Sequence, residues 1–295
     1  MQELEAGIDE NSAVNFWRHL TAQSSQQSTS EEGDIKALQP YELMAGVSRL
    51  PFTIPNVQFE GAHVETPLRR VWMRGVQEFY HSFAVNGFMD ELAQETGRDP
   101  LQMRIDMLQP SRRIQFIASR AHTGFWFDSG RMIALIERIR DVSGWSRPLP
   151  AGRGRGFAVH IQSATYVAMM AEVTANSDGA FSVDTIICVT DCGLVLNPDS
   201  ARAQVEGAIL YGMSSCLNSE ITLKNGRVVQ SNFHDYPVMR ITDSPRMVIE
   251  FMDNGRTPSG LGKPCVPLVA PAIVNAMANA GMQRMYEMPL RAMPA

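Results

Sequence analysis

Apolar residues recur at helical spacing in the first half of the chain. In "FYHSFAVNGFMDELAQE", the phenylalanines and Leu92 repeat near the 3.6-residue period, and Gly97 fits a C-terminal stop. We therefore expect a helix over about 79–95. A second helix should begin in "DPLQMRIDML", where Asp99 would cap it, Pro100 takes the first helical position and Gln102 completes a capping-box pattern.

Helical spacing returns in three later stretches. "DSGRMIALIERIRDV" places its apolar residues on one face and predicts a third helix. "NPDSARAQVEGAILYGMSSCL" predicts a fourth, opened by Asn197-Pro198, in which Gly207 and Gly212 leave room for close backbone approach. "PLVAPAIVNAMANAG" predicts a last helix that ends at Gly281.

Strand patterns dominate the second half of the chain. "YVAMMAEVTA" and "FSVDTIICVTD" flank the turn signal "NSDG", and "SEITL" and "RVVQSNF" flank "KNG", so we expect two hairpins. "RMVIEFM" predicts a further strand, and "RLPFTIPNVQFEGAHVETP" short strands between prolines. Helices and antiparallel hairpins are mixed without a βαβ rhythm, which indicates the α+β class.

The first 50 residues give the weakest pattern, and we expect them to be irregular. "AVNFWRHL" would make two helical turns, and the polar "TAQSSQQSTSEEGD" reads as a flexible linker. The chain then divides into an N-terminal segment with its linker over 1–45, a helix-rich region over 46–150, and a strand-and-helix region over 151–295.

Composition narrows the class of protein. The 295 residues are 44% hydrophobic and 19% charged with a net charge of −5, as expected of a folded globular protein. No run of Lys and Arg interleaves with aromatics, so we expect no nucleic-acid binding. No apolar run is long enough to span a membrane, and "MQELEAGIDENSAV" does not resemble a signal peptide. The four cysteines lack metal-ligand spacing, so buried thiols are favoured over a zinc site.

Three features suggest chemistry, each with a plainer alternative. "GRGRG" over 152–156 invites a dinucleotide-binding interpretation, but no helix pattern follows it, and a flexible approach to a strand from Phe157 is the better account. Gln204 interrupts an apolar helix and would suit a heterocycle with matching donors and acceptors, unless it simply faces solvent. Arg74-Gly75 precedes a helix and would suit an anion, unless Arg74 is a surface residue.

Taken in order, five motifs resemble the molybdenum hydroxylases of the xanthine dehydrogenase/aldehyde oxidase family. They are "WMRG…FAVNGFMDELAQETGRDPLQMRIDML", "MMAEVTA", "VTDCGLVLNPDSARAQVEGAILYGMSS", "SEITLKNGRVVQSNFHDYPVMR" and "SGLGKPCVPLVAPAIVNAMANA". The likeness spans about residues 45–290 and is closest to the large, molybdopterin-binding (beta) subunit of the isoquinoline 1-oxidoreductase type.

The resemblance implies a cofactor, partners and site residues. The cofactor would be molybdenum–molybdopterin in its cytosine dinucleotide form, and the reaction would hydroxylate an aromatic N-heterocycle or an aldehyde with oxygen from water. Electrons would leave through an iron–sulfur subunit. By position, Gln204 matches a glutamine that contacts the pterin, Arg74 and Gly75 match a loop that borders the cofactor, and the segment from Gly260 through Gly262 to Val266 matches the active-site loop.

Two departures from the family pattern change the expected function. The family's N-terminal half carries a GGFG-type loop and a GQG-type segment, and neither occurs here, so we expect the chain to need a partner that supplies the missing half of the cofactor cradle. The family also places a general-base glutamate where Lys263 stands. An ordinary lysine, with a pKa of about 10.4, is already protonated at neutral pH, so the chain alone should be inactive.

Three hypotheses follow. The leading one is the C-terminal molybdopterin-binding part of an isoquinoline 1-oxidoreductase-like enzyme, cytoplasmic by default or periplasmic if exported with a partner. The alternative is a non-catalytic scaffold or remnant that retains the fold and binds only protein. A third, weaker one uses Lys263 as a Schiff-base amine, which would require a desolvated lysine.

Overall fold

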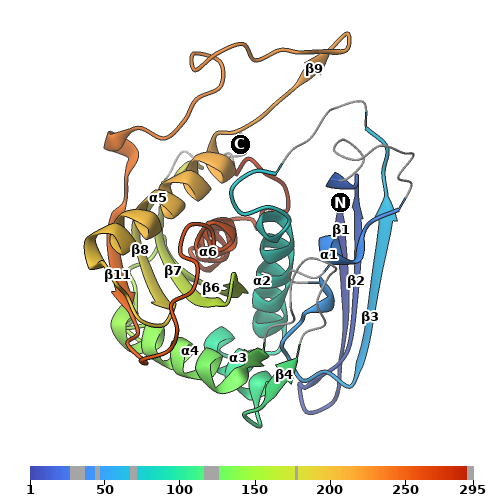
Figure 1. Cartoon of the computed structure of the whole chain (residues 1–295), viewed down its shortest axis with the longest axis vertical. Coiled ribbons are helices and arrows are strands. Elements are labelled where there is room, and N and C mark those ends of the chain that lie inside the picture. Colours follow the sequence, from blue (N-terminus) through green and yellow to red (C-terminus); the bar gives the residue numbers. More distant parts are fainter. Residues whose placement is uncertain (27–36, 44–46, 67–71, 116–125, 177–178, 291–295) are drawn as a thin grey trace. The chain divides into compact units, whose positions relative to one another are not determined.

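The computed structural model describes all residues except 27–36, 44–46, 67–71, 116–125, 177–178 and 291–295. The described chain divides into two compact units, 1–136 and 137–295 (Figure 1). The helix α4, Ser129–Ser143, crosses this boundary.

A three-stranded sheet opens the first unit. Its strands β1 (Gln2–Ile8), β2 (Val14–Gln23) and β3 (Asn56–His63) lie in the order β1-β2-β3, with β1 antiparallel and β3 parallel to β2. The expectation of an irregular start with two helical turns was therefore wrong. Trp17, His19 and Thr21 are buried at every second position, which is the period of a strand. Most of the expected linker lies outside the described residues.

The first unit contains one short helix that the sequence did not predict and two helices that follow the predictions closely. They are α1 (Pro40–Leu43), α2 (Glu78–Glu95) and α3 (Pro100–Leu108), and a short ribbon of β4 (Arg113–Gln115) and β5 (Trp126–Asp128) comes after them. Asp99 caps α3 by accepting hydrogen bonds from the backbone N–H groups of Leu101 and Gln102. The Gln102 side-chain amide donates to Asp106 Oδ1, and the other half of the capping box stays a prediction. Apolar side chains of β2, α2 and α3 form one core cluster, which includes Trp17, Met89 and Met103.

A four-stranded sheet is the centre of the second unit. Its strands are β6 (Arg153–Gln162), β7 (Thr165–Ala175), β8 (Phe181–Asp191) and β11 (Arg246–Phe251), in the order β11-β8-β7-β6. The β7–β8 hairpin is confirmed, although part of its turn lies outside the described residues. β11 pairs parallel with β8, because the chain crosses over through a helix between them.

Two helices cover one face of this sheet (Figure 1). α6 (Val266–Asn279) packs on β6 and β7, and α5 (Pro198–Leu217) packs on α6. All of the "GRGRG" motif except its first glycine lies in strand β6, so the expectation of a flexible approach was wrong. The element that follows β6 is the strand β7, whereas a dinucleotide-binding motif would be followed by a helix. A Cβ atom at Gly154 or Gly156 would overlap the backbone of Ala276 in α6. These glycines therefore let the helix lie directly on the strand.

The segment between α5 and β11 forms a long excursion. It carries the two-residue strands β9 (Leu223–Lys224) and β10 (Arg227–Val228) and a 3₁₀ turn, η3 (Ile241–Asp243). The second predicted hairpin is thus confirmed, though it is shorter than expected. Together the two units contain helices with mainly antiparallel sheets, which confirms the α+β class, while the three domain boundaries drawn from the sequence stay a prediction.

Candidate functional site

The glycine loop that precedes α6 is held from both sides. The Thr165 hydroxyl lies 2.7 Å from both Ser259 Oγ and the carbonyl oxygen of Gly260. The Ser259 backbone N–H donates to the carbonyl of Cys192 at 2.8 Å, and the Gly260 N–H donates to the carbonyl of Ser163 at 3.3 Å. The turn between β6 and β7 and the segment after β8 therefore fix where this loop begins.

Gln204 lies beside the same loop. Asn197 caps α5 by accepting a hydrogen bond from the Ser200 N–H, which places Gln204 in the first turns of the helix. A Cβ atom built on Gly262 would lie 3.7 Å from Gln204 Oε1, so the amide faces the loop at that point. Gln204, Gly260 and Gly262 are all exposed. The structure thus brings together three of the residues that the sequence assigned to a cofactor.

Lys263 follows directly in this loop and is exposed. Its carbonyl accepts a hydrogen bond from the Val266 N–H at 3.0 Å, which joins the loop to the first turn of α6. Within the described part of the chain, its ammonium has no ion-pair partner. A positive charge is therefore exposed next to Gly262, and its match to the family's general-base position stays a prediction.

Arg74 and Gly75 belong to the first unit and precede α2, as the sequence predicted. Gly75 is buried and has a φ of 101°, a conformation that favours glycine, and Arg74 is half-buried. Their place beside the cofactor, in one site with residues of the second unit, stays a prediction.

His160 is a residue that the sequence reasoning missed. It lies on β6 on the same side of the strand as Gly154 and Gly156, and so on the face that α6 covers. Burial lowers its pKa to about 4, so the imidazole is neutral at pH 7, and its Nε2 has no hydrogen-bond partner among the described residues. The only signal was one polar residue at an inward position of "GFAVHIQ".

Two buried thiols meet beneath the loop. Cys188 of β8 and Cys265, the residue before α6, have sulfur atoms 3.9 Å apart and are both fully buried. The hydrogen bond to Cys265, together with burial, raises the pKa of Cys188 well above its ordinary value. All four cysteines are free and buried, which confirms the interpretation as buried thiols.

These residues fit a pterin better than a bare metal ion. No group of three or more His, Cys, Asp or Glu side chains suited to a metal occurs among the described residues. The exposed amide of Gln204 offers both a donor and an acceptor, and the side-chain-free position at Gly262 admits a planar ring close to the backbone, whereas the space beside Gly260 is taken by Ser163. A metal carried by its own organic cofactor would therefore suit this site.

Residues 134–245 match the family model of the molybdopterin cofactor-binding domain. This range contains β6 to β8, all of α5 with Gln204, and the excursion that follows. The loop with Gly262 and Lys263 lies outside the matched residues. No helix of the described residues has the length and apolar character needed to cross a membrane.

Relatives and solved structures agree with this match. The chain is 33% identical over 77% of its length to the membrane-bound aldehyde dehydrogenase (pyrroloquinoline-quinone) of Gluconacetobacter polyoxogenes, and 30% identical over 77% to isoquinoline 1-oxidoreductase subunit beta of Brevundimonas diminuta. The aldehyde oxidoreductase of Desulfovibrio gigas has the same fold, with a TM-score of 0.72 at 14% identity over 99% of this chain and 48% of that one.

The chain spans only 30% and 28% of the length of the two curated relatives. The family model identifies residues 134–245 of this chain as a molybdopterin cofactor-binding domain. The chain belongs to the molybdenum hydroxylase family and corresponds to its C-terminal molybdopterin-binding part.

Proposed function

We propose that this chain supplies one wall of the molybdopterin site of an isoquinoline 1-oxidoreductase-like hydroxylase. The observation that carries the proposal is the contact between Gln204 and the glycine loop, where a Cβ on Gly262 would be 3.7 Å from Gln204 Oε1. Two residues 58 positions apart in sequence thereby form one exposed polar edge next to a helix start.

Each residue of this edge has a defined task in the proposal. The Gln204 amide hydrogen-bonds to the ring of the cofactor, Gly262 leaves the ring free to approach the backbone, and Gly260 lets the loop lie close against Ser163. Thr165 holds the loop in place through Ser259 and the Gly260 carbonyl. When bound, the cofactor supplies the redox chemistry that adds oxygen from water to an electron-poor carbon.

Several finer features belong to the same proposal. The cofactor is the cytosine dinucleotide form, the substrate is an aromatic N-heterocycle or an aldehyde, and an iron–sulfur subunit accepts the electrons. A polypeptide resembling the N-terminal half of the family's large subunit completes the cradle, and Arg74 with Gly75 borders the cofactor. The similarity to isoquinoline 1-oxidoreductase subunit beta supports these assignments.

Lys263 decides how well such a site performs catalysis. Hydroxylation requires a group that removes a proton from the attacking oxygen, and general-base catalysis contributes typically ~10²–10⁴-fold to a rate. An exposed ammonium has no lone pair to accept that proton. The proposed enzyme is therefore impaired with lysine at this position. Exposure also argues against the Schiff-base hypothesis, which needs a desolvated amine.

A second candidate function is a non-catalytic scaffold that retains the fold. The exposed positive charge of Lys263 at the base position favours it. The two candidates differ in one measurable property, because a scaffold would bind partner protein without molybdenum or pterin.

The test is to co-express the chain with polypeptides that resemble the remainder of the large subunit and to measure molybdenum and pterin in the purified complex. We expect both near one per chain, and at least a fivefold loss in Gln204→Ala. Gln283→Ala, which removes an exposed amide outside the loop, is the matched control and should retain both. If complexes form with every partner but contain no molybdenum, the proposal is overturned. If they contain pyrroloquinoline quinone instead of molybdenum and pterin, the site binds a different cofactor.

A further inference from the structure

Four arginines line a recess on the sheet face of the second unit that is opposite α6. The recess has a volume of about 450 Å³, and its arginines are Arg147, Arg153, Arg155 and Arg246. Among the described residues that line it, Glu172 is the one carboxylate. Because the glycines between the arginines of β6 face α6, the arginine side chains point to the other side of the sheet. The recess is thus distinct from the glycine-loop site.

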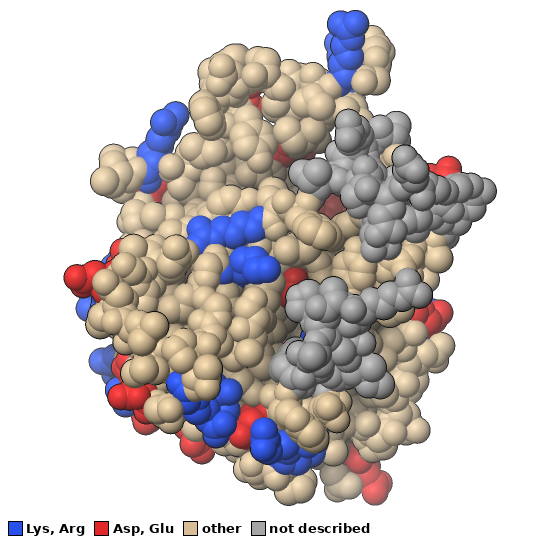
Figure 2. All heavy atoms as spheres, in the orientation of Figure 1, with Lys and Arg blue, Asp and Glu red and all other residues tan. Residues whose placement is uncertain are grey.

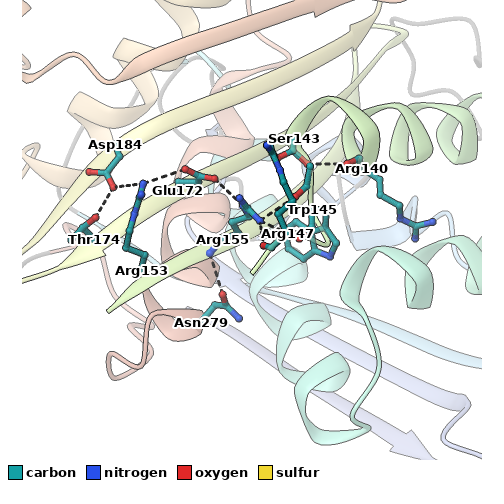
Figure 3. A network of polar contacts seen from close by, with 11 residues as sticks. Arg140, Ser143, Trp145, Arg147, Arg153, Arg155, Glu172, Thr174, Asp184 and Asn279 are labelled. Atoms are coloured by element: carbon teal, nitrogen blue, oxygen red, sulfur yellow. Dashed lines mark hydrogen bonds and ion pairs between the residues drawn. The ribbon is translucent and has the colours of Figure 1, made fainter. Parts of the chain in front are cut away.

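Arg155 lines the recess and is held by four hydrogen bonds of its side chain. Its Nε donates to Glu172 Oε1 at 2.8 Å, and its Nη1 donates to the carbonyls of Gly144, Trp145 and Arg147 at 2.6–3.2 Å. Only 9% of its side chain is exposed. Figure 3 shows this guanidinium between Glu172 and the segment that follows α4. Arg155 therefore fixes that segment against the sheet and does not itself need a ligand.

Arg153 is only partly neutralised. Its Nη2 lies 3.3 Å from Glu172 Oε2 and 3.1 Å from Asp184 Oδ2. Both carboxylates are shared, since Glu172 also binds Arg155 and Asp184 also accepts a hydrogen bond from Thr174 (Figure 3). The Nε of Arg153 is buried and has no hydrogen-bond partner among the described residues. The Nε is closed off from solvent, but about a third of the Arg153 side chain (34%) is exposed, and this part of the guanidinium is open to a ligand.

Arg147 and Arg246 have no carboxylate partner within the described ranges. The Arg147 guanidinium lies over Gly144, and its Nη2 has one long contact of 3.5 Å with the Ser143 carbonyl. The nearby Glu250 does not compensate them, because it pairs with Arg138. Four arginines against Glu172 and Asp184 leave two positive charges in the recess.

Figure 2 shows both basic and acidic side chains on the face that it draws, so that face carries no broad field of one sign. A concave site with two uncompensated guanidinium groups selects a compact ligand with several negative oxygen atoms. Guanidinium groups bind phosphate oxygens in a bidentate manner, with charge-assisted hydrogen bonds roughly twice as strong as neutral ones.

We propose that this arginine recess binds the phosphoryl group of a small molecule, with Arg147 and Arg246 as the principal ligand-contacting residues and Arg153 as a third donor. The volume of about 450 Å³ admits a pyrophosphate or a mononucleotide. The arginine recess is independent of the molybdopterin site, so this proposal holds even if the chain proves to be a non-catalytic scaffold.

The test is isothermal titration calorimetry of the full chain with pyrophosphate, inorganic phosphate and adenosine monophosphate, each against sodium chloride at equal ionic strength. We expect saturable 1:1 binding of at least one phosphoryl ligand. Tighter binding of the mononucleotide than of the inorganic ions would identify a nucleotide as the source of the phosphoryl group, and the reverse order would identify a free phosphate. No heat above the chloride arm for any ligand would overturn the proposal.

Charge-matched variants separate the recess from general attraction to a cationic surface. Arg147→Gln with Arg246→Gln should weaken binding at least tenfold. Lys224→Gln with Arg227→Gln removes the same charge from the exposed β9–β10 hairpin and should bind like the wild type. Equal weakening by both pairs would contradict the proposal. If circular dichroism shows that the Arg147→Gln/Arg246→Gln variant does not fold, the single variant Arg246→Gln replaces it. We expect this single variant to bind the phosphoryl ligand severalfold more weakly, and wild-type affinity would contradict the proposal.

Discussion

The side-chain oxygen of Gln204 lies directly beside Gly262, where a β-carbon would be 3.7 Å away from it. Gln204 comes from the start of α5, and Gly262 comes from the loop that leads into α6. The packing of α5 on α6 sets this juxtaposition, and the hydrogen bonds of Thr165 hold the loop in register. Helix packing and the clamped loop together produce the exposed edge that we assign to a pterin.

Gly262→Val should remove cofactor binding without unfolding the protein. The glycine is exposed, and a β-carbon there would make an ordinary contact, so the thermal midpoint should change little. The larger side chain would fill the space beside Gln204, and molybdenum in the partner complex should fall at least fivefold. Full molybdenum content in this variant would show that the cofactor does not lie along this edge.

Gly156→Ala should destabilise the second unit by about 1–3 kcal/mol, the usual cost of forcing extra atoms into a packed interior. The added methyl group would overlap backbone atoms of Ala272 and Ala276. The measurement is the free energy of unfolding in urea. Gly87→Ala, in α2 with no atom within 4 Å of the new carbon, should be neutral or slightly stabilising. Equal effects of the two changes would refute the close approach of α6 to β6.

Arg155→Met should destabilise the protein by about 3 kcal/mol or more, because it leaves the half-buried Glu172 carboxylate without its nearer partner and frees three carbonyl groups. The comparison is Arg138→Met, which breaks an exposed pair with Glu250 and should cost under about 1 kcal/mol. Denaturant titration of both variants gives the difference. A loss at Arg155 no larger than that at Arg138 would argue against its anchoring role.

His160 should make stability depend on pH between about 6.5 and 4. Burial lowers the pKa of this imidazole from 6.5 to about 4, so the unfolded chain binds a proton in that interval and the folded chain does not. Stability is therefore full above pH 6.5 and falls with pH, by about 2 kcal/mol between pH 7 and pH 5 from this residue.

Urea unfolding at pH 7 and pH 5 tests the role of His160. Between pH 7 and pH 5, the free energy of unfolding of His160→Leu should fall by about 2 kcal/mol less than that of the wild type. His234→Leu, which changes an exposed histidine, should behave like the wild type. His19 in the first unit also has a pKa lowered to about 4 by burial, so some pH dependence should persist in all variants. If the free energy of unfolding of His160→Leu falls between pH 7 and pH 5 by as much as that of the wild type, His160 is not the source of this pH dependence.

Local patterns in the sequence were sufficient to predict most helices and hairpins. Asp99 and Asn197 cap the helices that they were expected to cap, because capping depends on residues only two or three positions away. The strand β2 was missed, because the "AVNFWRHL" stretch has apolar residues compatible with either period. Its burial at alternate positions follows from pairing with β1 and β3, which no local pattern contains.

The site was only partly accessible from sequence. Gln204 and the glycine loop were found through the family motifs, since helix packing alone brings them together. The roles of Thr165 and His160 depend on which residues β6 and β7 place against the loop and α6. The "GRGRG" motif was misread for the same reason, because its glycines serve contact with a helix more than 110 residues away in sequence.

The most direct measurement of the central claim is the hydroxylation rate per bound molybdenum in the partner complex, compared between the wild type and Lys263→Glu. The account predicts a slow wild type and an increase of ~10²-fold or more in the variant, because the carboxylate restores a proton acceptor beside the cofactor. A wild type that already turns over rapidly, or a loaded Lys263→Glu complex with no increase, would contradict the claim that Lys263 occupies the position of the catalytic base.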